Sequence, residues 1–426
     1  MNKKFTITGR QKLSGQYPVQ GSKNAALPLL SAALLSKSVV RFQNVPRIAD
    51  VTSLLQLIEA LGITMSWEKD DLSVDTNKFR GGELPDELVE KLRGSILLLG
   101  ALAPHVDSLS CPLPGGCPIG RRSFDMHWEV FRAAGFSVVE ESGRVTLTRA
   151  KTIEFPQVYL KESSVTATEN ALILFSALGK GLIENPAREP HVLTLIQFLR
   201  ELGCQIELHP LYYRIQTGPT NQNNELSFRI PADYIDAGTI AIAAAVTGGK
   251  VDLLGVTRED FLPIQNIFER FLVKFDKPSS DVIQVAGESL SNPPQVTAGL
   301  WPSFPTDLVS LAIVLATQGK GPCLIHDWMY EARMFFIDKL VRMGAAITMC
   351  DPHRVVVEGP TLLHGIDLES PDIRAGMALV VAGLCADGVT TIEHTEVIQR
   401  GYANVAERLT SIGAQIKEHN SDTPSA

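Results

Sequence analysis

Two kinds of helical pattern alternate along this chain, separated by short segments in which apolar and polar residues alternate as in β-strands. One kind is amphipathic and predicts surface helices, whereas the other is apolar nearly all round and predicts buried helices. The apolar stretches cover residues 27–35, 96–102, 171–178, 240–246, 308–316 and 377–384. We therefore expect six helices in the interior, with strands and amphipathic helices around them.

The amphipathic helices mark an internal repeat. Five of them end in a glycine, which is a helix C-cap signal, at Gly62, Gly135, Gly203, Gly344 and Gly413. A further copy ends Arg270-Phe271-Leu272-Val273, without the glycine. The period of about 70 residues exceeds the roughly 20–50 residues of solenoid repeats. Six such units predict an α/β fold of two three-unit domains, each with buried central helices and sheets outside.

Composition narrows the functional class. A chain of 426 residues with 45% hydrophobic and 20% charged residues is typical of a folded protein with two domains. The formal net charge of −8 argues against nucleic-acid binding but does not exclude binding of a small anionic ligand.

The apolar runs are shorter than the ~20 residues of a membrane span. No signal peptide is visible, and the six cysteines show neither a C-x-x-C pair nor zinc spacing. We expect reduced thiols, no metal, no membrane association and a cytoplasmic location.

A cysteine in a Gly/Pro-rich loop is the first candidate for chemistry. The segment reads Pro114-Gly115-Gly116-Cys117-Pro118-Ile119-Gly120-Arg121-Arg122. Glycine allows close approach of a ligand to the backbone, and nearby cations favour the reactive thiolate over the thiol. Cys117 is therefore a candidate acid or nucleophile. The alternative is an idle thiol in a surface turn.

Cations stand where three of the buried helices begin. Lys23, Arg93 and Arg374 each oppose the positive end of a helix dipole, at a cost of roughly 0.3–1 kcal/mol. An anion bound between the cation and the helix end would turn this conflict into attraction. The pattern therefore predicts phosphate or carboxylate ligands, against the alternative of solvated surface residues. Asp307 and Asp372 suit their helix N-termini, and plain N-capping is the alternative to a functional role for both.

Other residues carry less specific signals. Arg333 and Arg400 follow polar connections, and i,i+4 pairing on a helix face is their alternative role. Residues 187–190 and 231–234 have the character of domain crossovers. His127 lies between Met126 and Trp128, which favours a packed rather than a catalytic imidazole.

Several of these segments together resemble the UDP-N-acetylglucosamine enolpyruvyl transferase (1-carboxyvinyltransferase) family. They read Gly21-Ser22-Lys23-Asn24-Ala25-Ala26, Leu113-Pro114-Gly115-Gly116-Cys117, Ala187-Arg188-Glu189-Pro190, Phe304-Pro305-Thr306-Asp307 and Arg400-Gly401-Tyr402. The resemblance runs from about Phe5 to Ile416 and implies two inside-out, barrel-like α/β domains, each of three β-α-β-α-β-β repeats around buried helices. One would span 23–231 and carry the Cys117 loop, the other would combine 1–22 with 232–426, and the active site would lie in the cleft between them.

The resemblance also implies a reaction. The enolpyruvyl group of phosphoenolpyruvate would pass to the 3-hydroxyl of UDP-N-acetylglucosamine by addition and elimination, releasing phosphate. This is the first committed step of peptidoglycan precursor synthesis, on which the cell wall, cell shape and cell division depend. It needs an acid, a base and cations for the anionic groups, and no cofactor.

Residue roles follow from the same resemblance. Cys117 matches the acid, with fosfomycin sensitivity, and Asp307 matches the base. Lys23, Arg122 and Arg400 match the cations on the phosphate side, and Arg93, Arg333 and Arg374 the other arginines, with carboxylate duties. The remaining substrate-binding residues would be Asn24, Ser164, Val165, Thr166, Met329 and Asp372.

The sequence departs from the family pattern at two recognition loops. The nucleotide loop, usually Ser-Val-Gly, is Ser164-Val165-Thr166, and the usual Ala-Arg-Pro-Val-Asp is Arg121-Arg122-Ser123-Phe124-Asp125. Ala332 also replaces the usual Asn before Arg333. These departures leave two alternatives open: an enolpyruvyl transferase acting on another nucleotide or sugar acceptor, and a non-catalytic paralogue that binds UDP-sugars. The shikimate-pathway enolpyruvyl transferase shares the fold but lacks the Pro-Gly-Gly-Cys loop.

Overall fold

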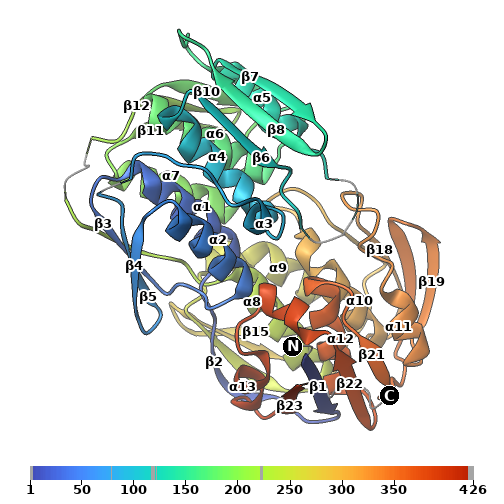
Figure 1. The fold of residues 1–426 in the computed structure, drawn as a ribbon. Coiled ribbons are helices and arrows are strands. Elements are labelled where there is room, and N and C mark those ends of the chain that lie inside the picture. The colour runs from blue at the N-terminus through green and yellow to red at the C-terminus, as the bar shows by residue number, and fades with distance from the viewer. Residues whose placement is uncertain (1–2, 78, 117–119, 121, 221–223, 421–426) are drawn as a thin grey trace, which may run out of the picture. The chain divides into compact units, whose positions relative to one another are not determined.

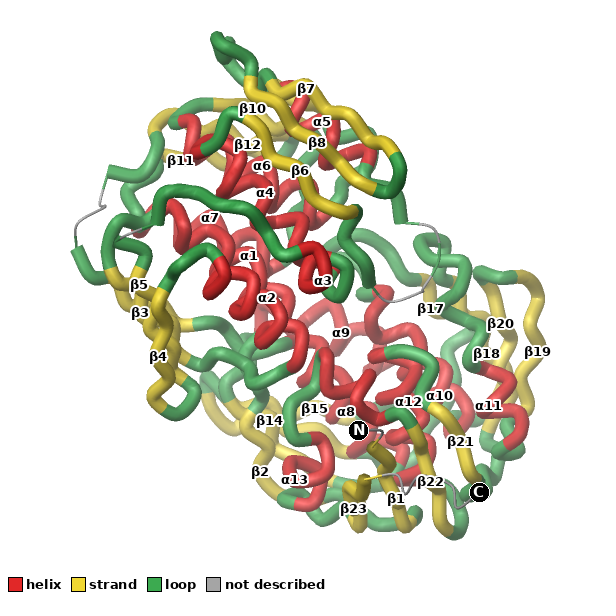
Figure 2. Tube along the Cα trace, viewed as in Figure 1, coloured by secondary structure: helices red, strands yellow, loops and turns green. Residues whose placement is uncertain are grey.

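The computed structural model describes residues 3–77, 79–116, 120, 122–220 and 224–420. These residues form two compact units. Gly21–Gly116 and Arg122–Pro231 make up the first unit, whereas the segment up to Gln20, Gly120 and the segment from Ala232 onward make up the second. In each unit, helices (red in Figure 2) occupy the interior and strands (yellow) lie around them.

Three helices that are apolar nearly all round form the centre of the first unit (Figure 1). They are α1 (Lys23–Ala32), α4 (Ile96–Leu102) and α6 (Val165–Leu178), and they contact one another. Shorter or amphipathic helices surround them: α2 (Ala49–Ala60), α3 (Asp86–Val89), α5 (Asp125–Ala133) and α7 (Pro190–Glu201). The 3-10 turns are η1 (Ala33–Leu35), η2 (Arg93–Ser95) and η3 (Ala103–His105). The expected buried helices of this unit are confirmed.

The second unit repeats this plan. Its central helices are α8 (Tyr234–Val246), α10 (Val309–Gln318) and α12 (Ile373–Cys385), which again contact one another. The outer helices are α9 (Arg258–Arg270), α11 (Ile337–Arg342) and α13 (Val405–Thr410), with the 3-10 turns η4 (Thr306–Leu308) and η5 (Thr395–Arg400). Packing of both faces of the central helices explains why their sequences lack a polar side.

Small separate sheets cover the helices. In the first unit they are β13-β3-β5-β4, β6-β8-β7 and β11-β12-β10-β9. Their strands are β3 (Val39–Gln43), β4 (Thr64–Glu68), β5 (Asp71–Asp75), β6 (Ser108–Pro112), β7 (Phe136–Glu141), β8 (Arg144–Arg149), β9 (Gln157–Tyr159), β10 (Gly181–Glu184), β11 (Gln205–His209), β12 (Tyr212–Thr217) and β13 (Leu226–Arg229). Because the sheets remain separate, the described part of this unit is not a closed barrel.

The sheets of the second unit are β15-β16-β14-β2, β17-β18-β20-β19 and β21-β22-β1-β23. Their strands are β1 (Lys3–Thr8), β2 (Ser14–Pro18), β14 (Lys250–Leu254), β15 (Lys274–Ser279), β16 (Val282–Ala286), β17 (Gln295–Thr297), β18 (Gly321–His326), β19 (Ala346–Asp351), β20 (Arg354–Gly359), β21 (Asp367–Glu369), β22 (Val389–Glu393) and β23 (Gln415–Asn420). Each four-stranded sheet has one parallel pair at an edge followed by two antiparallel pairs. The N-terminal strand β1 completes the last sheet by pairing with β22 and β23.

Two edge strands are exchanged between the repeats at the start of each unit. β2 immediately precedes α1 of the first unit but pairs with β14 of the second, whereas β13 precedes α8 of the second unit but pairs with β3 of the first. The crossing segments are hydrogen-bonded: Ser22 N–H donates to Pro231 O (2.8 Å), and Asp233 N–H donates to Gln20 O (2.8 Å). The chain thus crosses between units at residues 20–21 and 231–232, and Gly120 also belongs to the second unit, although residues up to 116 and from 122 belong to the first. The crossover expected at 187–190 is wrong, because this segment leads into α7 inside the first unit.

The repeated glycines end their helices in the left-handed conformation. Gly62, Gly135, Gly203, Gly344 and Gly413 have φ between +79° and +105°. In the copy without glycine, Leu272 adopts the same conformation with φ +63°. Its N–H donates to Glu269 O (2.9 Å), and Val273 N–H donates to Phe268 O (3.1 Å), which is the Schellman pattern. The fourth repeat along the chain therefore has the same turn, with a strained left-handed backbone at a residue that is not glycine.

Candidate active site

Asp307 of the second unit binds two arginines. Its Oδ2 lies 2.7 Å from Nη2 of Arg374, and its Oδ1 lies 3.2 Å from Nη2 of Arg333. The carboxylate is 27% exposed, whereas the side chain of Arg333 is only 2% exposed. Asp307 lies within η4 and does not cap α10, where no side-chain cap is present. N-capping is therefore the wrong explanation for Asp307.

The start of α12 positions Arg374. Asp372 is the N-cap and accepts hydrogen bonds from the N–H groups of Arg374 (2.7 Å) and Ala375 (3.0 Å). The guanidinium donates to Tyr402 Oη (2.9 Å) as well as to Asp307. Burial opposes the positive charge, but Asp307, Tyr402 and Asp233 outweigh it and raise the pKa of Arg374 above its usual range. Arg374 thus remains a cation inside the protein, at the helix end where the sequence predicts an anion.

Arg333 is buried next to a second carboxylate. Asp327 is fully buried, and its Oδ2 lies 3.9 Å from Nε of Arg333. Asp327 also accepts from Thr306 Oγ1 and from the N–H of Met329 (2.9 Å). The pairing with Asp307 excludes the alternative of Arg333 as a plain i,i+4 partner on a helix. Met329 is half-buried in the same turn, and Arg400 is the half-buried last residue of η5.

In the first unit, Lys23 is the first residue of α1. Its Nζ lies 2.6 Å from Oδ2 of Asp50 on α2, and both side chains are largely buried. Ser22 caps the helix by accepting from Ala25 N–H (3.3 Å). Asn24 follows in the first turn and is half-buried. The predicted conflict between Lys23 and the helix dipole is thus offset by a carboxylate of the protein itself.

Arg93 begins η2, which leads into α4. Its Nη2 donates to the carbonyl oxygens of Arg122 (2.9 Å) and Ser123 (3.1 Å), and its guanidinium stacks on the ring of Phe124 at 4.1 Å. The described part of the segment that differs from the family pattern, 122–125, is therefore attached to Arg93 through its backbone and through Phe124. Arg122 is itself half-buried.

The loop expected to bind a nucleotide forms the start of α6. Ser164 is the N-cap and accepts from Ala167 N–H (3.4 Å), and Val165 is the first helical residue. Oγ1 of Thr166 lies 3.0 Å from Nε2 of His127. The ring of His127 is buried, as the sequence predicts, and burial together with Arg93 and Arg122 lowers the pKa of His127 to about 3. The imidazole is therefore neutral at physiological pH.

Cys117, the candidate acid, lies outside the described residues, as does Arg121. The glycines beside it are required by close packing within each unit. A Cβ on Gly115 would lie 1.7 Å from Glu90 O, and one on Gly120 would lie 2.4 Å from Oε2 of Glu331. Gly116 and Gly120 also have positive φ. The loop thus needs glycine on both sides of the cysteine.

The sequence did not indicate the partners of the candidate cations. Asp50 contacts Lys23, 27 positions away in the chain, and Tyr402 contacts Arg374, 28 positions away. Asp327 lies next to Arg333, six positions away. Only the packing of separate elements brings these side chains together. In the sequence, Asp50 is only an acidic residue in the first turn of an amphipathic helix, and its burial is visible in the structure alone.

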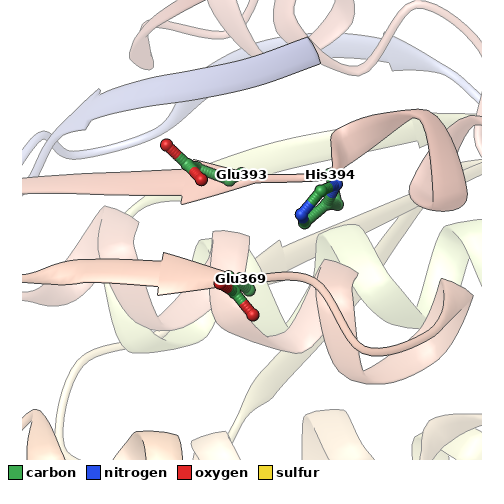
Figure 3. A group of neighbouring side chains, drawn as sticks. All are labelled: Glu369, Glu393 and His394. Carbon is green, nitrogen blue, oxygen red and sulfur yellow. The ribbon is translucent and has the colours of Figure 1, made fainter. Parts of the chain in front are cut away.

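Among the described residues, one group of potential metal ligands lies elsewhere, at the ends of β21 and β22. Ligand atoms of Glu369, Glu393 and His394 lie within 4.8 Å of one another, and both glutamates are exposed (Figure 3). Glu369 and Glu393 are register partners on β21 and β22. Exposed acidic side chains often gather without a metal ion, so we assign no metal site to this group.

The same two-unit α/β fold occurs in the enolpyruvyl transferase NikO from Streptomyces tendae, with a TM-score of 0.88 and 24% identity over 99% of this chain and 100% of that one. It also occurs in EPSP synthase from Acinetobacter baumannii, with a TM-score of 0.75 and 17% identity over 98% and 100% of the two chains. The architecture is therefore that of the enolpyruvyl transferases, as the sequence predicts.

The chain belongs to the family of EPSP synthase (3-phosphoshikimate 1-carboxyvinyltransferase), whose sequence model matches residues 7–409. Within it, the chain is similar to proteins named UDP-N-acetylglucosamine 1-carboxyvinyltransferase. That of Bradyrhizobium diazoefficiens is 39% identical over 97% of both chains, and that of Treponema denticola is 38% identical over 97% of this chain and 98% of its own. No helix in the described part of the chain is long and apolar enough to cross a membrane.

Proposed function

We propose that this chain is an enzyme that transfers the enolpyruvyl group of phosphoenolpyruvate to the 3-hydroxyl of UDP-N-acetylglucosamine, releasing phosphate. The observation that carries the proposal is the 39% identity to a UDP-N-acetylglucosamine 1-carboxyvinyltransferase over 97% of both chains. The reaction would supply the first precursor of peptidoglycan. Its phosphorylated substrates are those of the cytoplasm, which is where we place the enzyme.

The second unit supplies the base in this proposal. Asp307 would accept the proton of the sugar hydroxyl as its oxygen adds to C2 of phosphoenolpyruvate. In the structure this carboxylate is held by Arg333 and Arg374, and a neighbouring cation makes a carboxylate a poorer proton acceptor. We therefore expect the carboxylate of phosphoenolpyruvate to compete for these guanidinium groups. Substrate binding would then free Asp307 for its role.

The first unit supplies cations to the phosphate in this proposal. Lys23 and Arg122 would, with Arg400, stabilise the phosphate as it departs in the elimination step. Cys117 would donate the proton that the methylene carbon, C3, takes up in the addition. The same carbon must lose a proton in the elimination, so that the carbon–carbon double bond is restored in the product.

Product analysis tests the proposal. The chain is incubated with phosphoenolpyruvate and UDP-N-acetylglucosamine, and the nucleotide product is examined by mass spectrometry and proton NMR. A carboxyvinyl ether on the sugar with one phosphate released per product is expected. Unchanged nucleotide sugar, with phosphoenolpyruvate intact, would contradict the proposal.

The departures at the recognition loops keep a second candidate function open. Thr166 stands where the family pattern has glycine, and Phe124 lies in a segment that usually reads Ala-Arg-Pro-Val-Asp. Both residues are half-buried next to His127, so they alter the surface of this loop. A different nucleotide or sugar acceptor is the function that these residues favour. Binding of UDP-sugars without any turnover would instead support a non-catalytic paralogue.

A further inference from the structure

A chain of hydrogen bonds reaches Thr166 from inside the first unit. Nδ2 of Asn170 lies 3.2 Å from the carbonyl oxygen of Ile96 and 3.1 Å from Nδ1 of His127. On the other side of the ring, Nε2 of His127 lies 3.0 Å from Oγ1 of Thr166. Asn170 and His127 are buried, whereas Thr166 is half-buried. The chain thus runs outward from the core to a partly exposed hydroxyl.

The direction of each hydrogen bond is determined by its inner end. A carbonyl oxygen can only accept, so the atom of Asn170 facing Ile96 must be the amide nitrogen. The same nitrogen has a second hydrogen for Nδ1 of His127, which must then accept. A neutral imidazole that accepts at Nδ1 carries its proton on Nε2, and this N–H donates to Thr166. The opposite amide orientation would place two carbonyl oxygens against each other at 3.2 Å.

Thr166 is therefore left with a hydroxyl proton to donate. Within the part of the chain that the structure describes, Oγ1 of Thr166 has no hydrogen-bond partner besides His127. Because His127 already donates to this oxygen, the threonine O–H cannot point back to the ring. It must be satisfied by water or by an acceptor on a ligand. The ring is neutral, so this arrangement does not invert with pH in the physiological range.

We propose that Thr166 is a specificity-determining residue that donates a hydrogen bond to an oxygen of the nucleotide part of the acceptor substrate, and that His127 is the positioning residue that orients it. The inference rests on the proposed function, because the acceptor there is a nucleotide sugar and the family resemblance assigns residues 164–166 to the nucleotide. It goes further by assigning a side-chain donor that a glycine at this position could not provide. The positive end of the α6 dipole favours such an oxygen ligand.

Four variants test this inference by steady-state kinetics with UDP-N-acetylglucosamine and phosphoenolpyruvate. Thr166→Val removes the hydroxyl at constant shape and is expected to raise KM for the nucleotide sugar about 3- to 10-fold, with kcat and KM for phosphoenolpyruvate within about 2-fold. Thr166→Ser keeps the hydroxyl and is expected to behave as the parent. His127→Leu should reproduce the effect of Thr166→Val, whereas His127→Gln, which keeps a nitrogen donor, should retain most of the affinity.

The double variant Thr166→Val/His127→Leu separates positioning from general packing. If His127 acts through Thr166, the double variant has the same KM for the nucleotide sugar as Thr166→Val alone. Fully additive effects would overturn the role of His127, and an unchanged KM in Thr166→Val would overturn the whole inference. Calorimetric binding of UDP and of uridine to the same variants shows whether the acceptor oxygen is on the diphosphate or on the nucleoside. If only this inference is wrong, the parent chain and every variant turn over with an unchanged KM for the nucleotide sugar. If the proposed function is wrong, the parent chain itself is inactive.

Discussion

Nη2 of Arg374 lies 2.7 Å from Oδ2 of Asp307, although Asp307 lies in the 3-10 turn η4 before α10 and Arg374 lies in the first turn of α12. Arg333 holds the other oxygen of the same carboxylate. A carboxylate in contact with two largely buried guanidinium groups compensates their charges, so it has a structural role as well as the proposed chemical one. The two roles can be separated by experiment.

Asp307→Asn is expected to reduce turnover by at least about 100-fold, because the amide cannot accept the proton of the sugar hydroxyl. It should also lower the free energy of unfolding by about 2 kcal/mol, because Arg374 and Arg333 lose their counter-charge. Asp307 is 27% exposed, and this exposure moderates the loss of stability. Steady-state kinetics and urea unfolding measure the two effects. Asp307→Glu is the matched control that keeps the charge. Normal turnover in Asp307→Asn would exclude the base role.

The pair of Lys23 and Asp50 allows a cleaner separation. Lys23→Ala leaves Asp50 as a buried carboxylate without this partner, so the variant should be less stable by about 1–3 kcal/mol. Because the cation is also lost, kcat/KM for phosphoenolpyruvate should fall by about 100-fold. Adding Asp50→Asn should restore most of the stability but none of the activity. Recovery of activity in the double variant would show that Lys23 acts only as a structural partner of Asp50.

Leu272 offers a test of the internal repeat. It adopts φ +63° where five other repeats have glycine, and its side chain is 55% exposed. Leu272→Gly should remove a left-handed strain of roughly 1–2 kcal/mol at the expense of greater freedom in the unfolded chain. We expect a net gain of about 0.5–1 kcal/mol in urea unfolding. Leu272→Ala, which keeps the strain, should show no gain, and destabilisation by glycine would contradict the repeat alignment.

Cysteine labelling tests the chemical distinction of Cys117. Burial raises the pKa of Cys111 and Cys204 to about 11 and that of Cys323 and Cys385 to about 12, so these four remain protonated thiols at neutral pH. Fosfomycin at pH 7 should therefore modify Cys117 alone, as detected by peptide mass spectrometry. Cys350 is exposed and serves as an internal control for non-selective alkylation. Labelling spread over several cysteines, or its persistence in Cys117→Ser, would count against a special reactivity.

The sequence predicts those features of the fold that depend on local pattern. Helices without a polar face proved buried, and the glycine at the end of five of the six repeated amphipathic helices reflects a backbone conformation that few other residues adopt. Leu272 shows the limit of this signal, because the same turn forms without the glycine when the helix end is fixed by Phe268 and Glu269. The exchange of β2 and β13 could not be read from the chain, since edge-strand pairing depends on contacts between distant segments.

At the candidate active site, the residue types at the helix N-termini predicted the positions of the cations but not the residues that the cations contact. Lys23 and Arg374 lie in the first turns of their helices as expected, and protein carboxylates from other elements lie beside them. Asp372 caps α12, the role that the sequence offered as the plain alternative. The hydrogen bond of His127 to Thr166 was not foreseen, because it joins two helices 39 positions apart.

The central claim is tested most directly by measuring phosphate release from phosphoenolpyruvate with no acceptor, with UDP-N-acetylglucosamine and with shikimate 3-phosphate. We predict release that requires UDP-N-acetylglucosamine and is absent with the other two. Release with shikimate 3-phosphate, or no release with UDP-N-acetylglucosamine while phosphoenolpyruvate still binds, would contradict the proposed acceptor.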